Sequence, residues 1–277
     1  MANNIRINSR VASALQVGDV IAQSAYYGQS FVFITAFDPD AATYIEAVEA
    51  ADEQTLEAGV KLAIDVFVTG CKADGIWDAI KVSCILAGAR TLNGALVPLA
   101  GDAPTNFNFV SDDYDRVTGL KGDGGTKYLD SNQSKTGFPT SDNHMSLFIS
   151  EMSDTNSQVF MGAEVSDGRM TIGYNGNFFV RNRHNTAESI PFQTGFMALA
   201  RNNLTGYIGR SGGTDNHITR DATDSDDSKI WVFRRRGGTN LPATARMSFY
   251  SLGKYLEPAN FDARVSTLMA EIEAALT

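Results

Sequence analysis

The sequence is poor in the residue types that build metal centres and nucleophilic sites. Its 277 residues include only two cysteines, Cys71 and Cys84, and three histidines. No CxxC pair is present and no histidine lies near either cysteine, so the sequence does not indicate a zinc site. Because free cysteine behaves mainly as a small hydrophobic residue, we expect two buried thiols, with a disulfide or a reactive role as the alternative.

The three histidines show no metal-binding pattern. His144, His184 and His217 lie in the polar stretches DNHMS, RNRHNT and TDNHIT, far from one another in sequence. Metal ligands usually recur at a short, recognisable spacing. We interpret these histidines as loop or strand-end residues, with convergence across a sheet as the alternative.

Clustered positive charge and long hydrophobic runs are also missing. The formal net charge is −9 and the pI is about 4.8. This argues against a nucleic-acid partner, because phosphate binding needs clustered Lys and Arg. The basic run Arg234-Arg235-Arg236 follows the apolar stretch Ile230 to Phe233, so we interpret it as a strand end with its charges in water.

No apolar run approaches the roughly 18 residues of a membrane span. The first ten residues, MANNIRINSR, lack the apolar segment of a signal peptide. We therefore expect a soluble protein made in the cytoplasm, without a membrane span.

The glycine-rich stretch TGLKGDGGTKYLDSN at residues 118–132 invites a phosphate-binding interpretation. A Walker loop has the pattern GxxxxGK[ST] and opens a helix. Here Lys127 lies two residues after Gly125 and is followed by Tyr128, with strand and turn residues beyond it. We predict a tight turn at Asp123-Gly124-Gly125 between two strands, since glycine tolerates positive φ.

Catalytic signatures are missing as well. There is no GxSxG motif and no Ser/His/Asp order, and no spacing singles out a glycosidase carboxylate pair. The acidic segment RDATDSDDSK would suit Ca²⁺ by its oxygen ligands but lacks the EF-hand spacing, so we interpret it as a solvated loop, with calcium as the alternative. Its carboxylates belong to Asp221, Asp224, Asp226 and Asp227. We predict no catalytic, cofactor-binding or metal residue, no cofactor and no enzymatic activity.

Helical patterns are present between residues 39 and 90 and at the C-terminal end. Asp38-Pro39 resembles a helix cap followed by proline at the first helical position. Apolar residues at helical spacing predict a second helix that ends near Gly70 and a third from Asp74 to about residue 90. A last apolar stripe follows Pro258. The stripes of the four predicted helices contain Tyr44, Ile45 and Val48; Leu56, Val60, Ile64 and Phe67; Trp77, Ile80, Cys84 and Ala87; and Phe261, Val265, Leu268, Met269, Ile272 and Leu276.

Short alternating runs dominate from about residue 95 onward and predict a β-sandwich or jelly roll. Asn175-Gly176, between RMTIGY and NFFVR, is a strong hairpin signal because a type I′ turn needs positive φ at both positions. Trp231 and Phe233 should share one face of a strand whose other face carries Ile230 and Val232. Such a two-faced run indicates a central strand, or one that meets another subunit. The predicted strands centre on residues 107–109, 145–149, 159–165, 170–174, 178–180, 196–200, 207, 230–232 and 247–251.

Residues 1–37 are harder to classify. Alternation at Ile5 and Ile7 and at Phe31 and Phe33 suggests short strands. Tyr26, Tyr27, Trp77 and Trp231 are candidates for stacking on sugars, although the position of Trp77 in a helical stripe favours the core.

Three stretches resemble a known group of proteins: DGIWDAIKVSCILAGARTLNGALVPL (74–99), NFNFVSDDYDRVTGLKGDGGTKYL (106–129) and ARMSFYSLGKYLEPANFDARVSTLMAEIEAAL (245–276). Together they resemble tailed-bacteriophage virion proteins in which a small helical segment precedes a concanavalin- or laminin-G-like jelly roll and a short helix closes the chain. The resemblance covers about residues 38–277. It is a structural signature and transfers no catalytic residue.

The resemblance and the apolar patterns together predict mainly β structure with α-helices. We divide the chain into an N-terminal arm or attachment segment (1–37), a small helical segment (38–95), a β-sandwich domain (96–256) and a C-terminal helix (257–277). The resemblance implies a virion structural protein, for which we expect a tail or baseplate fibre-like role as a homotrimer bound to other virion proteins.

Three other functions remain open. The first alternative is a capsid-attached head fibre or cement protein. The second is a module that binds host cell-surface glycan through a rim between residues 182 and 227. The third alternative is a hydrolase with a sandwich fold.

Overall fold

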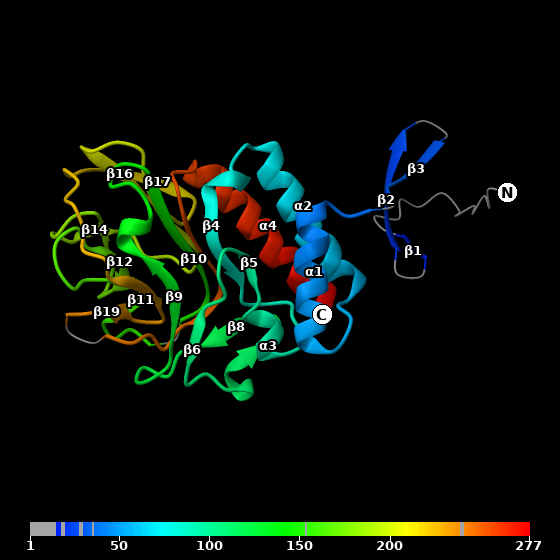
Figure 1. The fold of residues 1–277 in the computed structure, drawn as a ribbon, viewed down its shortest axis with the longest axis horizontal. Helices are drawn as coiled ribbons and strands as arrows, with labels where there is room; N and C mark the ends of the chain where they lie inside the picture. The colour runs from blue at the N-terminus through cyan, green and yellow to red at the C-terminus, as the bar shows by residue number, and fades with distance from the viewer. Residues whose placement is uncertain (1–14, 18–19, 28–29, 35, 153, 239–240) are drawn as a thin grey trace.

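The main body of the molecule has three layers, with helices packed on one face of a two-sheet sandwich (Figure 1). This computed structural model describes residues 15–17, 20–27, 30–34, 36–152, 154–238 and 241–277. The predicted sandwich, preceded by a small helical segment and closed by a C-terminal helix, is confirmed. We call the sheet next to the helices the inner sheet and the other one the outer sheet.

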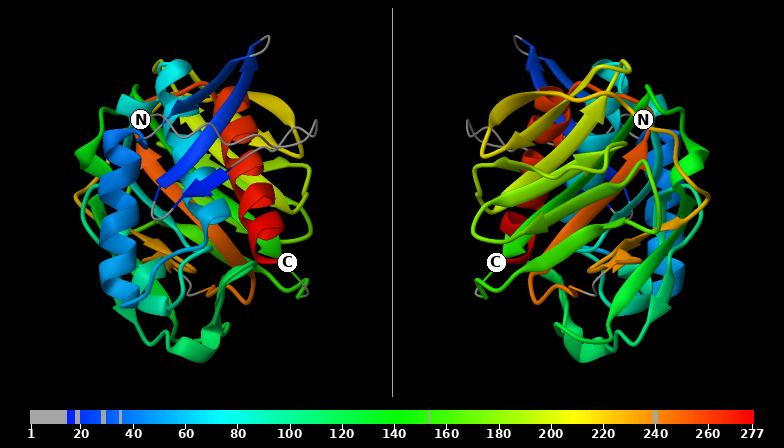
Figure 2. Two further views of the ribbon diagram at one scale, coloured as in Figure 1. Left: turned by 90° about the vertical axis from the view of Figure 1, so that its right-hand side faces the viewer. Right: turned by 90° about the vertical axis from the view of Figure 1, so that its left-hand side faces the viewer.

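The helical layer consists of α1 (Pro39–Asp52), α2 (Ala58–Ala73) and α4 (Pro258–Leu276). Asp38 caps α1 as predicted, because its side chain accepts a hydrogen bond from the Asp40 amide at 3.0 Å. The second helix continues past Gly70 to Ala73. Figure 2 shows the three helices standing on the inner sheet, with α2 packed against α4 on one side and α1 on the other.

The inner sheet has nine strands, and all of its pairings are antiparallel. Its main path runs β17-β16-β15-β10-β20-β4-β5, and β8 joins β20 and carries β7. The strands are β4 (Ile80–Ile85), β5 (Pro98–Ala100), β7 (Tyr114–Asp115), β8 (Gly119–Lys121), β10 (Asn143–Glu151), β15 (Gly195–Arg201), β16 (Gly206–Ser211), β17 (Thr214–Thr219) and β20 (Arg246–Gly253).

The outer sheet has eight strands along the path β14-β13-β12-β11-β18-β9-β6, and β19 pairs with β11 in parallel. Gly176, with φ of 102°, makes the predicted turn between β12 and β13. The strands are β6 (Thr105–Phe107), β9 (Tyr128–Ser134), β11 (Gln158–Ala163), β12 (Met170–Tyr174), β13 (Phe178–Asn182), β14 (Glu188–Ile190), β18 (Lys229–Val232) and β19 (Arg235–Arg236).

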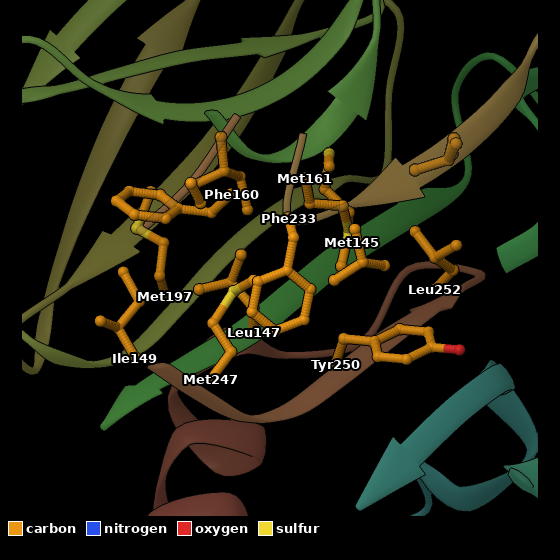
Figure 3. Close-up of a cluster of buried hydrophobic side chains, with 14 of the residues drawn as sticks. Met145, Leu147, Ile149, Phe160, Met161, Met197, Phe233, Met247, Tyr250 and Leu252 are labelled. Atoms are coloured by element: carbon orange, nitrogen blue, oxygen red, sulfur yellow. The ribbon is translucent and has the colours of Figure 1, made fainter. Parts of the chain in front are cut away.

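Two hydrophobic cores hold the layers together, one between the sheets and one between the inner sheet and the helices. In the inter-sheet core, Met145 and Leu147 of β10 face Met161 of the outer sheet, and Phe233 inserts among them (Figure 3). The helical core gathers around Phe261, whose ring lies 5.7 Å from that of Phe196 between centroids.

The third predicted helix is wrong: residues 77–79 form a single 3₁₀ turn, and residues 80–85 form β4. Val82 and Cys84 face the inter-sheet core, while Ile80 and Ile85 face the helices. The segment IKVSCI does alternate apolar and polar residues, but Ile80 and Cys84 are also spaced as in a helix. Together with Trp77 and Ala87 they therefore resembled one helical stripe.

The remaining elements are short connections. They are the 3₁₀ turns η1 (Trp77–Ala79), η2 (Ser111–Asp113) and η3 (Lys135–Gly137) and the helix α3 (Leu92–Ala95). No helix in the described ranges is long and apolar enough to cross a membrane.

The described N-terminal residues form a separate three-stranded antiparallel sheet: β1 (Leu15–Val17), β2 (Val20–Tyr27) and β3 (Ser30–Ile34). The predicted strand at Phe31 and Phe33 lies in β3, whereas the one at Ile5 and Ile7 falls outside the described residues.

Candidate functional site

The histidines predicted from the sequence do not come together. His144 is fully buried in β10, with Nδ1 2.5 Å from the Lys254 carbonyl oxygen and Nε2 2.9 Å from Ser251 Oγ. His184 accepts a hydrogen bond from the Thr186 amide in a loop, and His217 lies in β17. Burial lowers the pKa of His144 to about 4. His144 is therefore a neutral structural residue that joins β10 to β20.

Both cysteines are buried free thiols, as predicted. Cys71 lies in α2 and Cys84 in β4. Burial raises the pKa of each thiol to about 12, so neither is a reactive thiolate.

The acidic segment is a solvated loop, as predicted, with Asp221, Asp224 and Asp227 exposed, and its carboxylates are also bonded to the body. Asp226 Oδ1 lies 3.2 Å from the buried Lys135 Nζ and also accepts from Ser228. Asp224 accepts from Thr140 Oγ1 at 3.1 Å, and Asp227 accepts from Thr136 Oγ1 at 2.7 Å. The carboxylates thus point to different partners. Across the part of the chain that the structure describes, no three His, Cys, Asp or Glu side chains are grouped so that they could hold a metal ion.

The glycine-rich stretch forms the predicted turn between β8 and β9. The Asp123 carboxylate accepts hydrogen bonds from the amides of Gly125 and Lys127, at 2.8 and 3.0 Å. These bonds lower its pKa to about 2 despite the opposing effect of desolvation. The loop is closed by its own side chain, and Lys127 pairs with Asp113 at 2.5 Å.

Of the aromatic candidates, Trp77 is half-buried at the edge of the helical core rather than enclosed in it. Its Nε1 donates to Asp40 at 3.1 Å beside a surface hollow of about 420 Å³. Lys72, which also lines the hollow, is neutralised by Asp38 and Asp40. Tyr26 and Tyr27 lie in β2, and their side chains are outside the described part of the structure.

The most distinctive surface feature is a row of three aromatic rings across the outer face of the outer sheet. Phe107 of β6 stacks on Tyr128 of β9 with ring centroids 4.4 Å apart and an interplanar angle of 4°. Tyr128 in turn lies 4.4 Å from Trp231 of β18. We call Phe107, Tyr128 and Trp231 the aromatic row.

The rings of the aromatic row follow the strands that carry them, because their centroid spacing is close to the ~4.8 Å between neighbouring strands. Phe107 and Tyr128 turn their faces toward each other, and Trp231 is tilted by 33° to Tyr128. Phe107 lies on the edge strand and is 37% exposed, so it ends the row with a ring face that no other ring of the row covers.

A backbone kink at Phe233 positions arginine side chains beside the row. Phe233 has φ of 71°, a left-handed conformation that is rare for a bulky residue. The kink turns its ring into the inter-sheet core, so the expectation that Phe233 shares the face of Trp231 is wrong. After the kink, Arg235 and Arg236 run parallel to β11.

Arg234 and Arg236 lie over the aromatic row. The Arg234 guanidinium carbon is 4.8 Å from the Tyr128 ring centroid and 5.2 Å from that of Trp231, and Arg236 is 5.9 Å from Trp231. These are cation–π distances. Neither arginine forms an ion pair within 4.0 Å in the described ranges, and Trp231 Nε1 and Arg234 Nε are buried without a hydrogen-bond partner there.

The middle arginine of the run is buried instead of solvated, which corrects the expectation for it. Arg235 pairs with Glu164, which also binds Arg181 and accepts a hydrogen bond from Thr171 Oγ1 at 2.6 Å. Glu164 is 5% exposed. A buried carboxylate shared by two guanidiniums stabilises only because every member is paired.

Further cationic side chains lie near these arginines. Arg169, Arg181 and Arg235 lie close enough for Arg169 and Arg235 to lower the pKa of Arg181 by repulsion, although burial lowers it most. Lys229 lies 4.0 Å from Asp130 next to the row.

Sequence reasoning found Trp231 but missed its companions. Tyr128 and Phe107 each lie on a predicted or adjacent short strand, yet nothing local shows that these strands are neighbours of β18. The rim between residues 182 and 227 does not contain the aromatic row. The stretch TKYL held a signal for Tyr128, because alternation along a strand places it on the face opposite the buried Leu129.

Comparisons with known proteins do not assign a family. No protein-family model matches the chain, and no curated protein matches it. Solved structures match at low likeness. Domain 4 of AbnA, a GH43 arabinanase from Geobacillus stearothermophilus in complex with arabinotriose, is 12% identical with a TM-score of 0.41, over 60% of this chain and 82% of that one.

The botulinum neurotoxin serotype D binding domain is 12% identical with a TM-score of 0.48, over 72% of this chain and 52% of that one. A tailspike domain of bacteriophage CBA120 is 11% identical with a TM-score of 0.36, over 58% of this chain and 29% of that one. The chain thus spans less than two thirds of these last two structures. Likeness at this level carries no argument about function.

Proposed function

We propose that the chain is a non-catalytic structural subunit of a tailed-bacteriophage virion, a tail or baseplate fibre-like component that assembles as a homotrimer and presents its sandwich to host glycans. The resemblance of residues 74–99, 106–129 and 245–276 to virion proteins supports the structural role. The aromatic row is the observation that carries the glycan-binding role.

Aromatic rings and sugars are complementary because the apolar face of a pyranose stacks on a ring while its hydroxyls bond to polar groups around it. The exposed face of Phe107 suits such stacking. Asn132 and Lys229, which bond to each other at 3.2 Å, supply polar groups on the strands that carry Tyr128 and Trp231. A ligand crossing the row from β6 to β18 meets both kinds of group.

The glycan-binding role is tested with purified protein and polysaccharide from the host envelope. Phe107→Ala should weaken binding at least tenfold while lowering the free energy of unfolding by less than about 1 kcal/mol, because the ring is exposed and its loss leaves no core cavity. Tyr255→Ala, a change of aromatic residue just before α4, is the matched control and should bind as the wild type does. Unchanged binding by Phe107→Ala would remove the row from the proposal.

The virion role is tested by labelling intact particles with antibody against the chain. Label at the tail or baseplate supports the fibre-like role, and label over the head would favour the second candidate, a head fibre or cement protein. A mass measurement in solution tests the trimer. Release of oligosaccharides from host polysaccharide would show an enzyme and contradict the non-catalytic role.

A further inference from the structure

We propose that the glycan bound at the aromatic row is acidic, with its carboxylates held by Arg234 and Arg236. This inference rests on the proposed glycan-binding function and adds the ligand class. It makes Arg234 and Arg236 the residues that distinguish acidic from neutral polymers.

The first support is that these two guanidiniums lack a carboxylate partner, unlike others on this protein. Arg116, Arg210 and Arg264 bind Glu57, Asp262 and Asp74 at 2.6 to 2.7 Å. Arg234 and Arg236 have no such partner in the part of the chain that is described. Arg236 contributes to lowering the pKa of Asp227, after the hydrogen bonds from Thr136 and Ser134, which lower it most.

The second support is that Arg234 is held in place before any ligand arrives. Its guanidinium lies over both Tyr128 and Trp231, and the strained backbone at Phe233 fixes the point from which it projects. A planar cation stacked on aromatic rings loses little further freedom when it binds. Backbone strain of this kind concentrates at functional sites.

The third support is the positive charge gathered at one ring. Arg234 and Arg236 both lie within cation–π distance of Trp231, at 5.2 and 5.9 Å from its ring centroid. Two guanidiniums beside one ring favour an anionic ligand.

A carboxylate is the group that this geometry suits best. Arginine binds carboxylates through two parallel hydrogen bonds, and such charge-assisted bonds are about twice as strong as neutral ones. A neutral glycan offers these guanidiniums only hydroxyl acceptors, which form weaker hydrogen bonds than a carboxylate does. Duplex DNA carries one negative charge per about 1.7 Å of its axis, whereas a uronic-acid polymer carries at most one per sugar, so the polymer brings less negative charge against a protein of net charge −9 and is the better match.

The test uses four acidic polymers: polygalacturonate, alginate, hyaluronate and polysialic acid. Each is paired with the same polymer after chemical reduction of its carboxylates to alcohols. Binding of the full chain is measured by titration at low and physiological salt. We expect at least one acidic polymer to bind, its reduced form to bind tenfold or more weakly, and added salt to weaken the complex.

Variants locate the effect. Arg234→Gln and Arg236→Gln should each weaken acidic binding about tenfold, and Arg234→Lys should recover only part of it because lysine cannot form the paired bonds. Lys254→Gln removes the same charge from an exposed side chain elsewhere and should bind normally. Melting temperatures of all variants establish that they are folded.

The outcomes separate the two proposals. Equal binding of acidic and reduced forms, lost in Phe107→Ala, would overturn the acidic ligand and leave the glycan-binding function standing. Acidic binding that survives both Arg→Gln changes would also overturn the inference. Binding of none of the eight polymers would count against both, and equal binding of a DNA duplex would show that charge alone is recognised.

Discussion

Individual residues on the outer face show how the protein accommodates buried charge. Glu164 is shared by Arg181 and Arg235, so the loss of one carboxylate takes a counter-charge away from two guanidiniums. Taking away one partner of a buried ion pair costs far more than the pair contributes, because the remaining charge is left desolvated. Glu164 is therefore important mainly because its loss would leave buried positive charge poorly balanced.

Glu164→Gln should lower the free energy of unfolding by about 3–5 kcal/mol. Glu188→Gln is the matched control, since Glu188 pairs with the largely exposed Arg220, and it should cost less than about 1 kcal/mol. Urea denaturation of the two variants measures the difference. Equal losses would mean that Glu164 does not balance the buried guanidiniums.

Among the elements, α4 is the one that fixes the helical layer to the inner sheet. The Phe261 ring packs edge-on against Phe196, Phe249 and His144, with centroids 5.7 to 5.8 Å apart. These partners come from three different strands of the inner sheet. A single side chain therefore joins the helix to the middle of the sheet.

Phe261→Ala should destabilise the protein by about 3–5 kcal/mol, because it removes a fully buried ring and leaves a cavity between two rigid layers. Phe107→Ala makes the same chemical change at an exposed site and should cost less than about 1 kcal/mol. Thermal unfolding compares them. A small effect for Phe261→Ala would show that the helix is held mainly by other contacts.

The elements also show where the sequence was informative. Helices with one apolar stripe, such as α1 and α4, were predicted because one face of each is apolar. Strands such as β10 and β12 were predicted because their apolar residues alternate with polar or small ones, although both faces of these strands are buried. β4 was misassigned because Ile80 and Cys84 also fit a helical stripe that runs from Trp77 to Ala87. β17 was missed because it is an edge strand with the polar sequence TDNHIT, and little of it is buried.

The candidate site was predictable only in part, for a related reason. Alternation places Trp231 on an outer face, but the row depends on β6, β9 and β18 being neighbours, which is a property of the topology. The position of Arg234 depends on positive φ at Phe233, and a phenylalanine gives no sign of that conformation in sequence. Side-chain sites that arise from strand order are therefore hidden in a single sequence.

At the scale of the whole molecule, stability should depend on pH through His144, which lies where the helical layer meets the inner sheet. Burial lowers its pKa from 6.5 to about 4, so the folded protein keeps it neutral. Between these two values the unfolded chain binds a proton that the folded protein does not. Stability must then fall as the pH decreases through this window.

The wild-type protein should lose about 3 kcal/mol of unfolding free energy from this residue between pH 7 and pH 4, relative to a His144→Gln variant measured at the same pH values. Carboxylates with lowered pKa, such as Asp123 at about 2, lose their contribution only at lower pH. Urea midpoints from pH 8 to pH 4 give the difference curve. A flat difference would show that His144 titrates normally.

The place of β20 in the inner sheet has a consequence for the making of the protein. β20 lies between β10 and β4, so the sheet is joined across its middle by a strand that is translated after both of its neighbours. A ribosome that stops before residue 246 releases a chain with two unsatisfied strand edges and no route to close them. A truncated chain therefore cannot complete the inner sheet, so only a chain that includes β20 reaches the folded state.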